Sequence, residues 1–278
     1  MKEIIVADPT GFCFGVRRAI ETLEKILKEE GPVYSLGMPI HNPQEVERLT
    51  KKGLVVVDSP DLIPLASRTF VRAHGVSPEL LKSLHERCTQ VTDGTCPFVK
   101  IAQERAKVLA QEGFEVCIVG NGNHPEVKAL KGIAGDKSFI IDSKECVINV
   151  GKISKIGVIS QTTQDSRDFA AIVSELALKS EEMRVYNTIC NATRERQDAT
   201  RKLAQRVEGI IVVGGRNSAN TGKLYEIARS TGVDVVWIEH AEELDRRWLL
   251  DKARVGITAG ASTPDWLINQ LKKIMVIT

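Results

Sequence analysis

The chain lacks any long hydrophobic run. None of its apolar stretches approaches the roughly 18–20 residues that a membrane-spanning helix needs, so we expect no transmembrane segment and no membrane partner. Residues 1–8 are too short and too acidic for a secretory signal peptide, and we expect a cytoplasmic protein. Because the cytosol is reducing, the six cysteines should serve as ligands, nucleophiles or core residues rather than as a disulfide framework.

Aromatic residues are few, and neither sign of charge is in large excess. The 278 residues include only three Trp and three Tyr, and the formal net charge is +2. A base-stacking platform needs aromatic side chains and nucleic-acid binding needs a basic surface, so we expect no nucleic-acid partner. The apolar (42%) and charged (27%) fractions are those of an ordinary globular protein, long enough for one large domain or two to three small ones.

Familiar nucleotide and hydrolase motifs are absent from the sequence. Gly120 and Gly122 do not complete a G-x-G-x-x-G pattern, and Gly222-Lys223-Leu224 lacks the hydroxyl residue of a P-loop. There is no H-E-x-x-H and no G-x-S-x-G. If the protein is an enzyme, its chemistry does not use these well-known fingerprints.

What the sequence does contain is a pattern of 29 residues that occurs three times. The copies begin at Cys13, Cys96 and Cys190, each at the expected start of a helix. A glycine that ends an apolar run follows 24 residues later, at Gly37, Gly120 and Gly214. Four positions further on stands a polar residue: His41, His124 or Ser218. One thiol and one polar loop residue per copy predict three related modules that face a shared centre.

Helices and strands are expected to alternate in the same order in each copy. Second helices are predicted at 43–52, 126–131 and 222–230, second strands at 54–57, 138–141 and 233–238, and third strands at 69–72, 156–159 and 255–258. A loop of small residues and a closing helix follow each third strand. This alternation predicts an α/β fold of three small parallel modules at residues 13–95, 96–189 and 190–278, with the amino-terminal strand in 1–12 joining the third.

The repeated cysteines indicate a metal or cluster site. A thiol at a helix amino terminus has a lowered pKa, which favours the thiolate that a metal needs. Structural zinc sites usually pair cysteines at short spacing, and no such pair exists here, whereas an iron–sulfur cluster can take three distant thiolates and leave one iron open. Three buried cysteines retained through repeat ancestry are the alternative. The cysteines outside the pattern, Cys88, Cys117 and Cys146, are expected to be structural.

Polar residues gather in the loops that follow the strands, where parallel sheets bind ligands. They include three histidines and several hydroxyl and amide side chains: His41, His74, His124, Thr162, Ser218, Asn220 and Ser262. With the free N–H groups of helix starts, they suit an anionic ligand. Glu126 either delivers a proton to a reducible substrate or complements a helix dipole. His85 and His240 match no repeat position and are expected to be ordinary residues.

Several longer motifs carry a resemblance to a known family. They are Gly11-Phe12-Cys13-Phe14-Gly15-Val16, Ile40-His41-Asn42-Pro43, Arg72-Ala73-His74-Gly75, Asp93-Gly94-Thr95-Cys96-Pro97, His124-Pro125-Glu126, Ser160-Gln161-Thr162-Thr163, Asn187-Thr188-Ile189-Cys190 and Gly260-Ala261-Ser262-Thr263-Pro264. With these, essentially the whole chain resembles the LytB-type (IspH) 4-hydroxy-3-methylbut-2-enyl diphosphate reductases of the non-mevalonate isoprenoid pathway. That resemblance implies a trefoil of three α/β domains around one 4Fe–4S cluster.

The resemblance also implies roles for individual residues. Cys13, Cys96 and Cys190 would each bind one iron, and the substrate hydroxyl would bind the fourth. The diphosphate would be held by His41, His74, His124, Ser218, Asn220 and Ser262. Glu126, Thr162 and His124 would act in catalysis, with Glu126 on the proton relay. Reduced ferredoxin or flavodoxin would supply two electrons, and loss of the hydroxyl would give isopentenyl and dimethylallyl diphosphates.

One position departs from the family pattern. The family commonly has two serines before the asparagine, whereas Ser218-Ala219-Asn220 has one, which removes a side-chain donor to the phosphates. Two rival functions remain. A quinolinate synthase-like dehydratase would need a dicarboxylate site richer in arginine, and a non-catalytic zinc-stabilised scaffold would hold zinc and no iron.

Overall fold

A computed structural model describes residues 3–276 of the chain. The α-helices are α1 (Phe14–Ile26), α2 (Pro43–Thr50), α3 (Pro78–Arg87), α4 (Pro97–Gln111), α5 (Pro125–Ala134), α6 (Ser166–Ala177), α7 (Asn191–Ala204), α8 (Ala219–Ser230) and α9 (Asp265–Val276). The strands are β1 (Glu3–Val6), β2 (Val33–Leu36), β3 (Leu54–Val57), β4 (Arg68–Val71), β5 (Gln90–Asp93), β6 (Glu115–Val119), β7 (Ser138–Ile141), β8 (Ile153–Ser160), β9 (Ser180–Val185), β10 (Gly209–Val213), β11 (Asp234–Ile238) and β12 (Arg254–Ala259).

The strands form three four-stranded parallel sheets with one shared topology. Their orders are β3-β2-β4-β5, β7-β6-β8-β9 and β11-β10-β12-β1, so the same relative strand occupies the same place each time. Every pairing is parallel, as helical crossovers between strands require. The predicted fold class, α/β with three small parallel sheets, is therefore confirmed, and the cysteines do stand immediately before α1, α4 and α7.

The sequence reading missed the fourth strand of two sheets. Strands β5 and β9 follow the closing helices and lead into Cys96 and Cys190, as β1 leads towards Cys13. Both are edge strands with polar sequences, Gln-Val-Thr-Asp and Ser-Glu-Glu-Met-Arg-Val, and neither has a fully buried side chain. They lack the apolar run that marks β3 at the opposite edge of its sheet, so they give a weak sequence signal.

The chain divides into two compact units. The first comprises residues up to Arg17, His41–Val46 and the chain from Asn191 on, and the second comprises Arg18–Ile40 and Glu47–Cys190. The sheet of β1, β10, β11 and β12 lies in the first unit, and the other two sheets lie in the second. The division into three domains at Cys96 and Cys190 stays a prediction.

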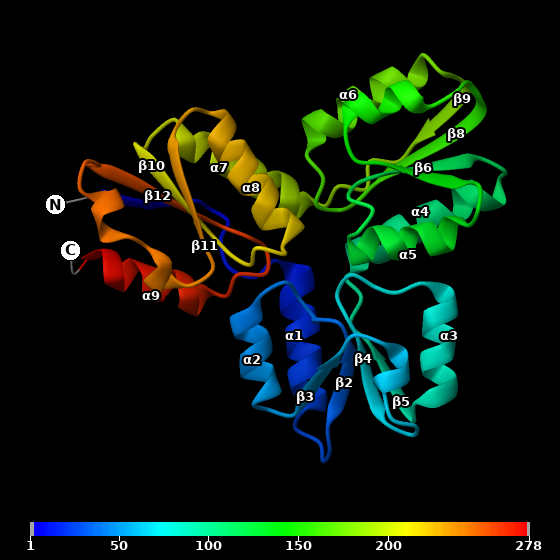
Figure 1. Cartoon of the computed structure of the whole chain (residues 1–278), viewed down its shortest axis with the longest axis horizontal. Helices are drawn as coiled ribbons and strands as arrows, with labels where there is room; N and C mark the ends of the chain where they lie inside the picture. Colours follow the sequence, from blue (N-terminus) through cyan, green and yellow to red (C-terminus); the bar gives the residue numbers. More distant parts are fainter. Residues whose placement is uncertain (1–2, 277–278) are drawn as a thin grey trace. The chain divides into compact units, whose positions relative to one another are not determined.

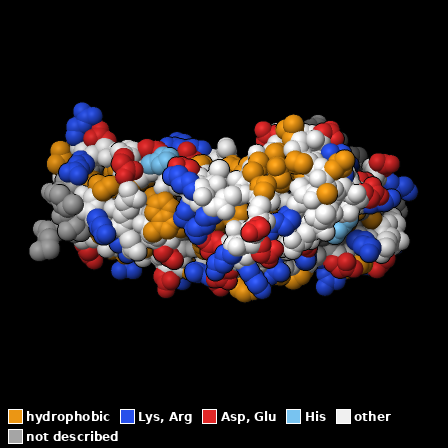
Figure 2. Space-filling model, turned by 90° about the horizontal axis from the view of Figure 1, so that it is seen from below, with side chains coloured by type: hydrophobic (Ala, Val, Ile, Leu, Met, Phe, Trp, Pro, Cys, Tyr) orange, Lys and Arg blue, Asp and Glu red, His pale blue; other side chains and the backbone are white. Residues whose placement is uncertain are grey.

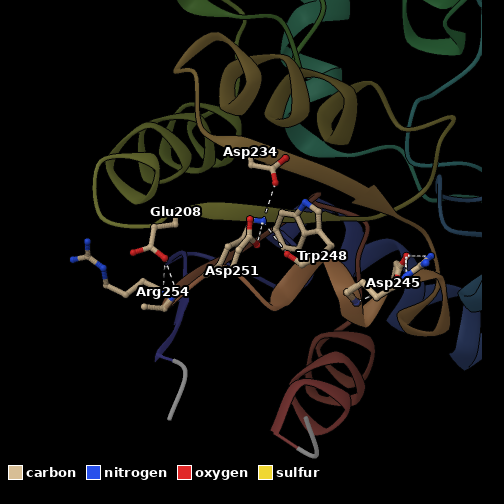
Figure 3. Close-up of polar contacts among 9 residues, drawn as sticks. Glu208, Asp234, Asp245, Trp248, Asp251 and Arg254 are labelled. Carbon is tan, nitrogen blue, oxygen red and sulfur yellow. Dashed lines mark hydrogen bonds and ion pairs between the residues drawn. The ribbon is translucent and has the colours of Figure 1, made fainter.

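In the first unit, helices cover both faces of the sheet. Alternate residues of β10 point to opposite faces: Ile211 packs with α9, and Ile210 packs with α7 and α8. Figure 1 shows α9 on one face of this sheet and α7 and α8 on the other. Lys252 lies 7% exposed at the amino ends of the strands, paired with Asp234 at 2.9 Å and Asp251 at 2.8 Å beside the Trp248 ring (Figure 3). This charged cluster is satisfied internally, and the predicted site residues of this unit lie at the opposite, carboxyl end of the sheet.

In the second unit, helices pack on the faces of both sheets. Helices α4 and α5 pack on one face of the β6–β9 sheet, and α6 packs on the other. Helix α3 covers one face of the β2–β5 sheet, where Leu84 packs on Ile63 and Val71. Cys117 lies fully buried in β6, and burial raises the pKa of its thiol to about 12, as a core residue requires.

The face of the molecule seen in Figure 2 has no dominant charge. Acidic and basic side chains are interspersed over the face seen in Figure 2, and hydrophobic side chains form only small groups there. Within residues 3–276, no helix is long and apolar enough to cross a bilayer.

Candidate active site

Each repeated cysteine is fixed by the same backbone hydrogen bond. The N–H of Cys96 donates to the carbonyl of Ala73 at 3.0 Å, and the N–H of Cys190 donates to that of Thr162 at 3.1 Å. In the first unit, the N–H of Cys13 donates to the carbonyl of Ala261 at 3.1 Å. The three acceptors lie at equivalent positions after β4, β8 and β12. The repeat therefore joins every cysteine to the carboxyl end of a sheet.

The chain approaches two of these cysteines through tight turns. Gly11 has a φ of +73°, and a Cβ there would lie 2.0 Å from the Asp265 carboxylate, so only glycine fits two residues before Cys13. Its carbonyl accepts a hydrogen bond from the buried Arg196 guanidinium at 2.8 Å. A Cβ on Gly94 would lie 2.1 Å from the Phe70 ring, which brings the turn before Cys96 close to β4.

The three thiols suit a metal or cluster better than the other cysteines do. Cys13, Cys96 and Cys190 are half-buried at helix starts, so their sulfur atoms are neither sealed in the core nor fully exposed. Cys117 is sealed in the core. Cys88 lies 3.0 Å from the Thr69 hydroxyl, and Cys146 is exposed beside Asp142. The donor set that the repeat predicts is thus chemically distinct from the remaining thiols.

Glu126 is the most perturbed acid of the second unit. It lies 1% exposed in the first turn of α5, and burial raises its pKa to about 7 although both carboxyl oxygens accept hydrogen bonds from Thr162. The backbone N–H of Thr162 donates at 2.6 Å and its hydroxyl at 2.8 Å. Since the Thr162 carbonyl accepts from Cys190, one residue links this acid to a predicted cluster ligand.

Two predicted phosphate ligands of the second unit are in contact. His124 caps α5, and its Nδ1 accepts the N–H of Glu126 at 3.2 Å, which fixes the ring and leaves Nε2 as its second nitrogen. The ring of His74 meets that of His124 edge to face, with centroids 5.2 Å apart. His124 is 7% exposed, so this pair forms a nearly buried imidazole surface next to Glu126.

The first unit gathers the hydroxyl and amide residues. Ser218 caps α8, where its Oγ accepts the N–H of Thr221 at 3.3 Å and so keeps its own proton available for donation. Asn220 Oδ1 accepts the N–H of Ala261 at 3.1 Å, while its buried Nδ2 has no hydrogen-bond partner among the described residues. Ser262 donates to the carbonyl of His41 at 3.0 Å.

The structure reveals an equivalence that the sequence reading missed. Asn220 and Glu126 are both the second residue of their helices, and each accepts the backbone N–H of the residue whose carbonyl binds a cysteine. In one copy that residue is Thr162, and in the other it is Ala261. Aligning the copies on their helix starts would have found this match, because Pro125-Glu126 then falls on Ala219-Asn220.

Sequence reasoning also missed Gln161. Its Oε1 accepts the N–H of Asn121 at 3.1 Å and its Nε2 donates to Thr163, so it braces the loop that leads to His124. A Cβ on Gly120 would lie 2.7 Å from the Gln161 side chain, which explains the glycine at that repeat position.

The comparison with known proteins agrees with this arrangement. A family model described as LytB protein matches residues 4–276. The chain belongs to the LytB protein family. The 4-hydroxy-3-methylbut-2-enyl diphosphate reductase of Aquifex aeolicus is 43% identical over 276 residues, which cover 98% of this chain and 95% of the relative. The reductase of Geobacter sulfurreducens is 42% identical over 270 residues, covering 97% and 95% of the two chains.

Two solved structures share the fold of this LytB-family chain. The E-1-hydroxy-2-methyl-but-2-enyl-4-diphosphate reductase from Plasmodium falciparum superposes with a TM-score of 0.93 at 28% identity, covering 98% of this chain and 87% of that one. A structure described as the terminal enzyme of the non-mevalonate pathway has a TM-score of 0.72 at 41% identity and full coverage of both chains. The predicted family resemblance is confirmed, and membership of this family of reductases implies a metal cofactor.

Proposed function

We propose that this protein reduces 4-hydroxy-3-methylbut-2-enyl diphosphate to isopentenyl and dimethylallyl diphosphates. The allylic C–O bond breaks, two electrons and two protons enter, and the hydroxyl leaves as water. The single observation that carries the proposal is the chain Glu126–Thr162–Cys190, in which a buried acid with a pKa of about 7 is joined through one residue to a predicted cluster ligand. The names of the relatives supply the substrate.

We infer that Cys13, Cys96 and Cys190 hold one 4Fe–4S cluster. Three thiolates from separate helix starts fit a cluster with one open iron better than a zinc site, which is normally closed by four ligands. When bound, the cluster supplies electrons and a Lewis-acidic iron for the substrate hydroxyl. A reduced ferredoxin or flavodoxin would be the electron donor, and the cytoplasm the compartment.

The diphosphate would be bound mainly by neutral donors. Ser218 offers a hydroxyl proton, Asn220 offers its Nδ2 hydrogens, and the amino terminus of α8 offers N–H groups. His74 and His124 would contribute imidazole nitrogens from the second unit, and His41 and Ser262 would complete the set. Ser262 would have to redirect its hydroxyl from the His41 carbonyl to reach a phosphate oxygen. Ala219 adds no hydroxyl, so the backbone N–H groups would substitute for that donor.

The proton would come from Glu126. A carboxyl group with a pKa of about 7 is half protonated at neutral pH, so it can both hold and release a proton under working conditions. Its two hydrogen bonds from Thr162 keep the carboxyl in one orientation, and the Thr162 hydroxyl provides a route for the proton away from the carboxyl. Protonation of the departing hydroxyl turns a poor leaving group into water.

Anaerobic purification and assay test this function. We expect a brown protein with about four iron and four sulfide ions per chain. After reduction, it should convert the hydroxylated allylic diphosphate to both isopentenyl products. A colourless protein with one zinc and no iron would favour the scaffold function. An iron-loaded protein that condenses a dicarboxylate substrate but leaves the allylic diphosphate intact would favour the quinolinate synthase-like alternative.

A further inference from the structure

The loop after β10 leads to Ser218, and two side chains of the β11 region hold its backbone. The indole N–H of Trp237 donates to the Gly214 carbonyl at 2.7 Å, and the N–H of Arg216 donates to Glu239 Oε1 at 2.5 Å. The Arg216 guanidinium also lies over the Trp237 ring at 5.3 Å and pairs with Glu243 at 3.2 Å. The loop is thus tied to the end of β11 through main-chain and side-chain contacts.

Glu239 also connects this loop to the segment that carries His41. The side-chain Nε2 of Gln44 donates to the Glu239 carbonyl at 2.6 Å. A Cβ on Gly215 would lie 2.6 Å from the His41 carbonyl oxygen and 3.6 Å from Glu239 Oε1, so the loop backbone passes directly against His41. Glu239 therefore contacts one segment through its carboxylate and the other through its carbonyl, and all of these residues belong to the first unit.

We propose that Glu239 is a positioning residue that sets the loop of residues 214–218 against His41 for diphosphate binding. A diphosphate has two anionic groups, and it binds best when donors on both segments are already at the right separation. The proposal rests on the proposed reductase function, since that function supplies the diphosphate. In this role Glu239 acts through its hydrogen bonds with the Arg216 N–H and the Gln44 side chain rather than as a phosphate ligand.

The charge of Glu239 and its hydrogen bonds predict opposite changes in phosphate affinity when the residue is replaced. A carboxylate beside an anion site repels phosphate, so removing it should tighten binding if its charge were the main effect. If its hydrogen bonds position the loop, removing them should weaken binding. A substitution to Gln keeps an acceptor for the Arg216 N–H and drops the charge, whereas a substitution to Ala removes both.

The second module offers a matched control. Asp142 follows β7 as Glu239 follows β11, but its carboxylate accepts from the Cys146 thiol at 3.2 Å. The loop of that module is braced by Gln161, which accepts the Asn121 N–H instead. Asp142→Ala therefore removes the equivalent acid without removing a contact to a ligand loop.

The experiment compares Glu239→Ala, Glu239→Gln, Gln44→Leu and Asp142→Ala in the cluster-loaded, reduced protein. We expect Glu239→Ala and Gln44→Leu to raise KM and the inhibition constant of inorganic pyrophosphate about tenfold with kcat nearly unchanged, as loss of one positioning hydrogen bond predicts. Glu239→Gln and Asp142→Ala should stay within about twofold of the wild type. The double variant of Glu239→Ala with Gln44→Leu should cost less than the two single effects combined.

Tighter pyrophosphate binding by Glu239→Ala, or an unchanged KM, overturns the proposal, as does a loss confined to kcat. If Glu239→Ala fails to fold, Gln44→Leu still decides, because an unchanged KM there removes the connection. Calorimetric titration of pyrophosphate into the same proteins measures binding without turnover, so it tests the role of Glu239 separately from the reductase function. A wild type without reductase activity would refute the function, while the ranking of pyrophosphate affinities would still test Glu239.

Discussion

Glu126 and Asn220 occupy the same position in two copies of the repeat, yet one is an acid and the other an amide. Each accepts the N–H of the residue that anchors a cysteine, so the backbone role is shared. The remaining atoms differ: Glu126 has a proton that titrates, and Asn220 has two hydrogens that do not. The symmetric scaffold thus gives one module a proton donor and another a permanent hydrogen-bond donor.

The first prediction concerns Glu126. Glu126→Gln should retain iron and substrate affinity but lower kcat by about 10²–10⁴-fold, because an amide has no proton to transfer. In the wild type, activity should fall as pH rises through about 7, since the raised pKa keeps the carboxyl protonated below that value and ionisation above it removes the acid. The residual activity of the variant should lack this fall. Stopped-assay rates across pH measure both effects.

Near-normal turnover in Glu126→Gln would remove this residue from the proton path. Thr162→Val is the companion variant, because it deletes the 2.8 Å hydroxyl contact to Glu126 and keeps the 2.6 Å backbone contact. Its activity should fall, and its iron content should match that of the wild type.

The second prediction concerns Asn220. Asn220→Asp keeps the acceptor for the Ala261 N–H but replaces the unpartnered Nδ2 with a carboxylate oxygen. The variant loses the hydrogen bond that Nδ2 would donate to the charged diphosphate, which is worth about 1.5–3 kcal/mol. Its buried carboxylate would also repel the phosphate charge. We expect KM to rise at least tenfold, and more at high pH than at low pH. An unchanged KM would mean that the amide does not face the phosphates.

At the scale of the elements, the sequence predicted the helices that follow the cysteines and the second strand of each module well, whereas α8 begins at Ala219 rather than at the predicted residue 222. Strands β3 and β7 have the predicted bounds, and β11 begins one residue later than predicted. Their apolar residues and the glycines between elements give strong signals. Strands β5 and β9 could not be read, because their polar, partly exposed sequences resemble loops, unlike the apolar strands at the opposite edges of the same sheets.

The candidate site was readable to a similar degree. Repetition placed Cys13, Cys96 and Cys190 at helix starts, which the structure has. It could not show that Thr162 serves Glu126 and Cys190 together, or that Glu239 holds the loop before Ser218. These contacts join residues far apart in the chain, and the spacing of residues within an element carries no information about them.

The third prediction uses two strand glycines that let helices approach the sheets. A Cβ on Gly157 in β8 would lie 2.7 Å from Leu109 of α4, and a Cβ on Gly256 in β12 would lie 2.8 Å from Leu203 of α7. Gly157→Ala and Gly256→Ala should each lower the free energy of unfolding by about 1–3 kcal/mol through overpacking. Urea unfolding followed by circular dichroism measures the loss.

Gly151→Ala is the control for these variants. Its added Cβ would meet nothing within 4 Å, so its stability should stay within about 0.5 kcal/mol of the wild type. Equal losses at all three glycines would point to a backbone effect rather than to helix–sheet contact.

At the scale of the whole molecule, three sheets of one topology present loops of unequal chemistry. Each cysteine follows a strand and stands immediately before a helix, so the three thiols occupy equivalent positions in the fold. The acid, the imidazole pair and the hydroxyl–amide set are divided among the copies. A reaction that binds an anion at one end and delivers a proton at the other needs this inequality, and a structural zinc site does not.

The fourth prediction separates the two groups of thiols across the whole chain. Replacing Cys88, Cys117 and Cys146 together with Ala should leave the iron content unchanged, because none of them follows the repeat. The triple variant should still lose about 1 kcal/mol of stability, mostly from the cavity at fully buried Cys117.

Replacing Cys13, Cys96 or Cys190 singly with Ser should instead reduce bound iron and bleach the cluster absorbance. Each serine variant removes one of three proposed ligands at a half-buried helix start, so a large loss of folding stability is not expected. Iron and sulfide analysis with anaerobic absorption spectra measures the outcome, and full iron with an unchanged spectrum in a serine variant would show that the replaced cysteine is not a ligand.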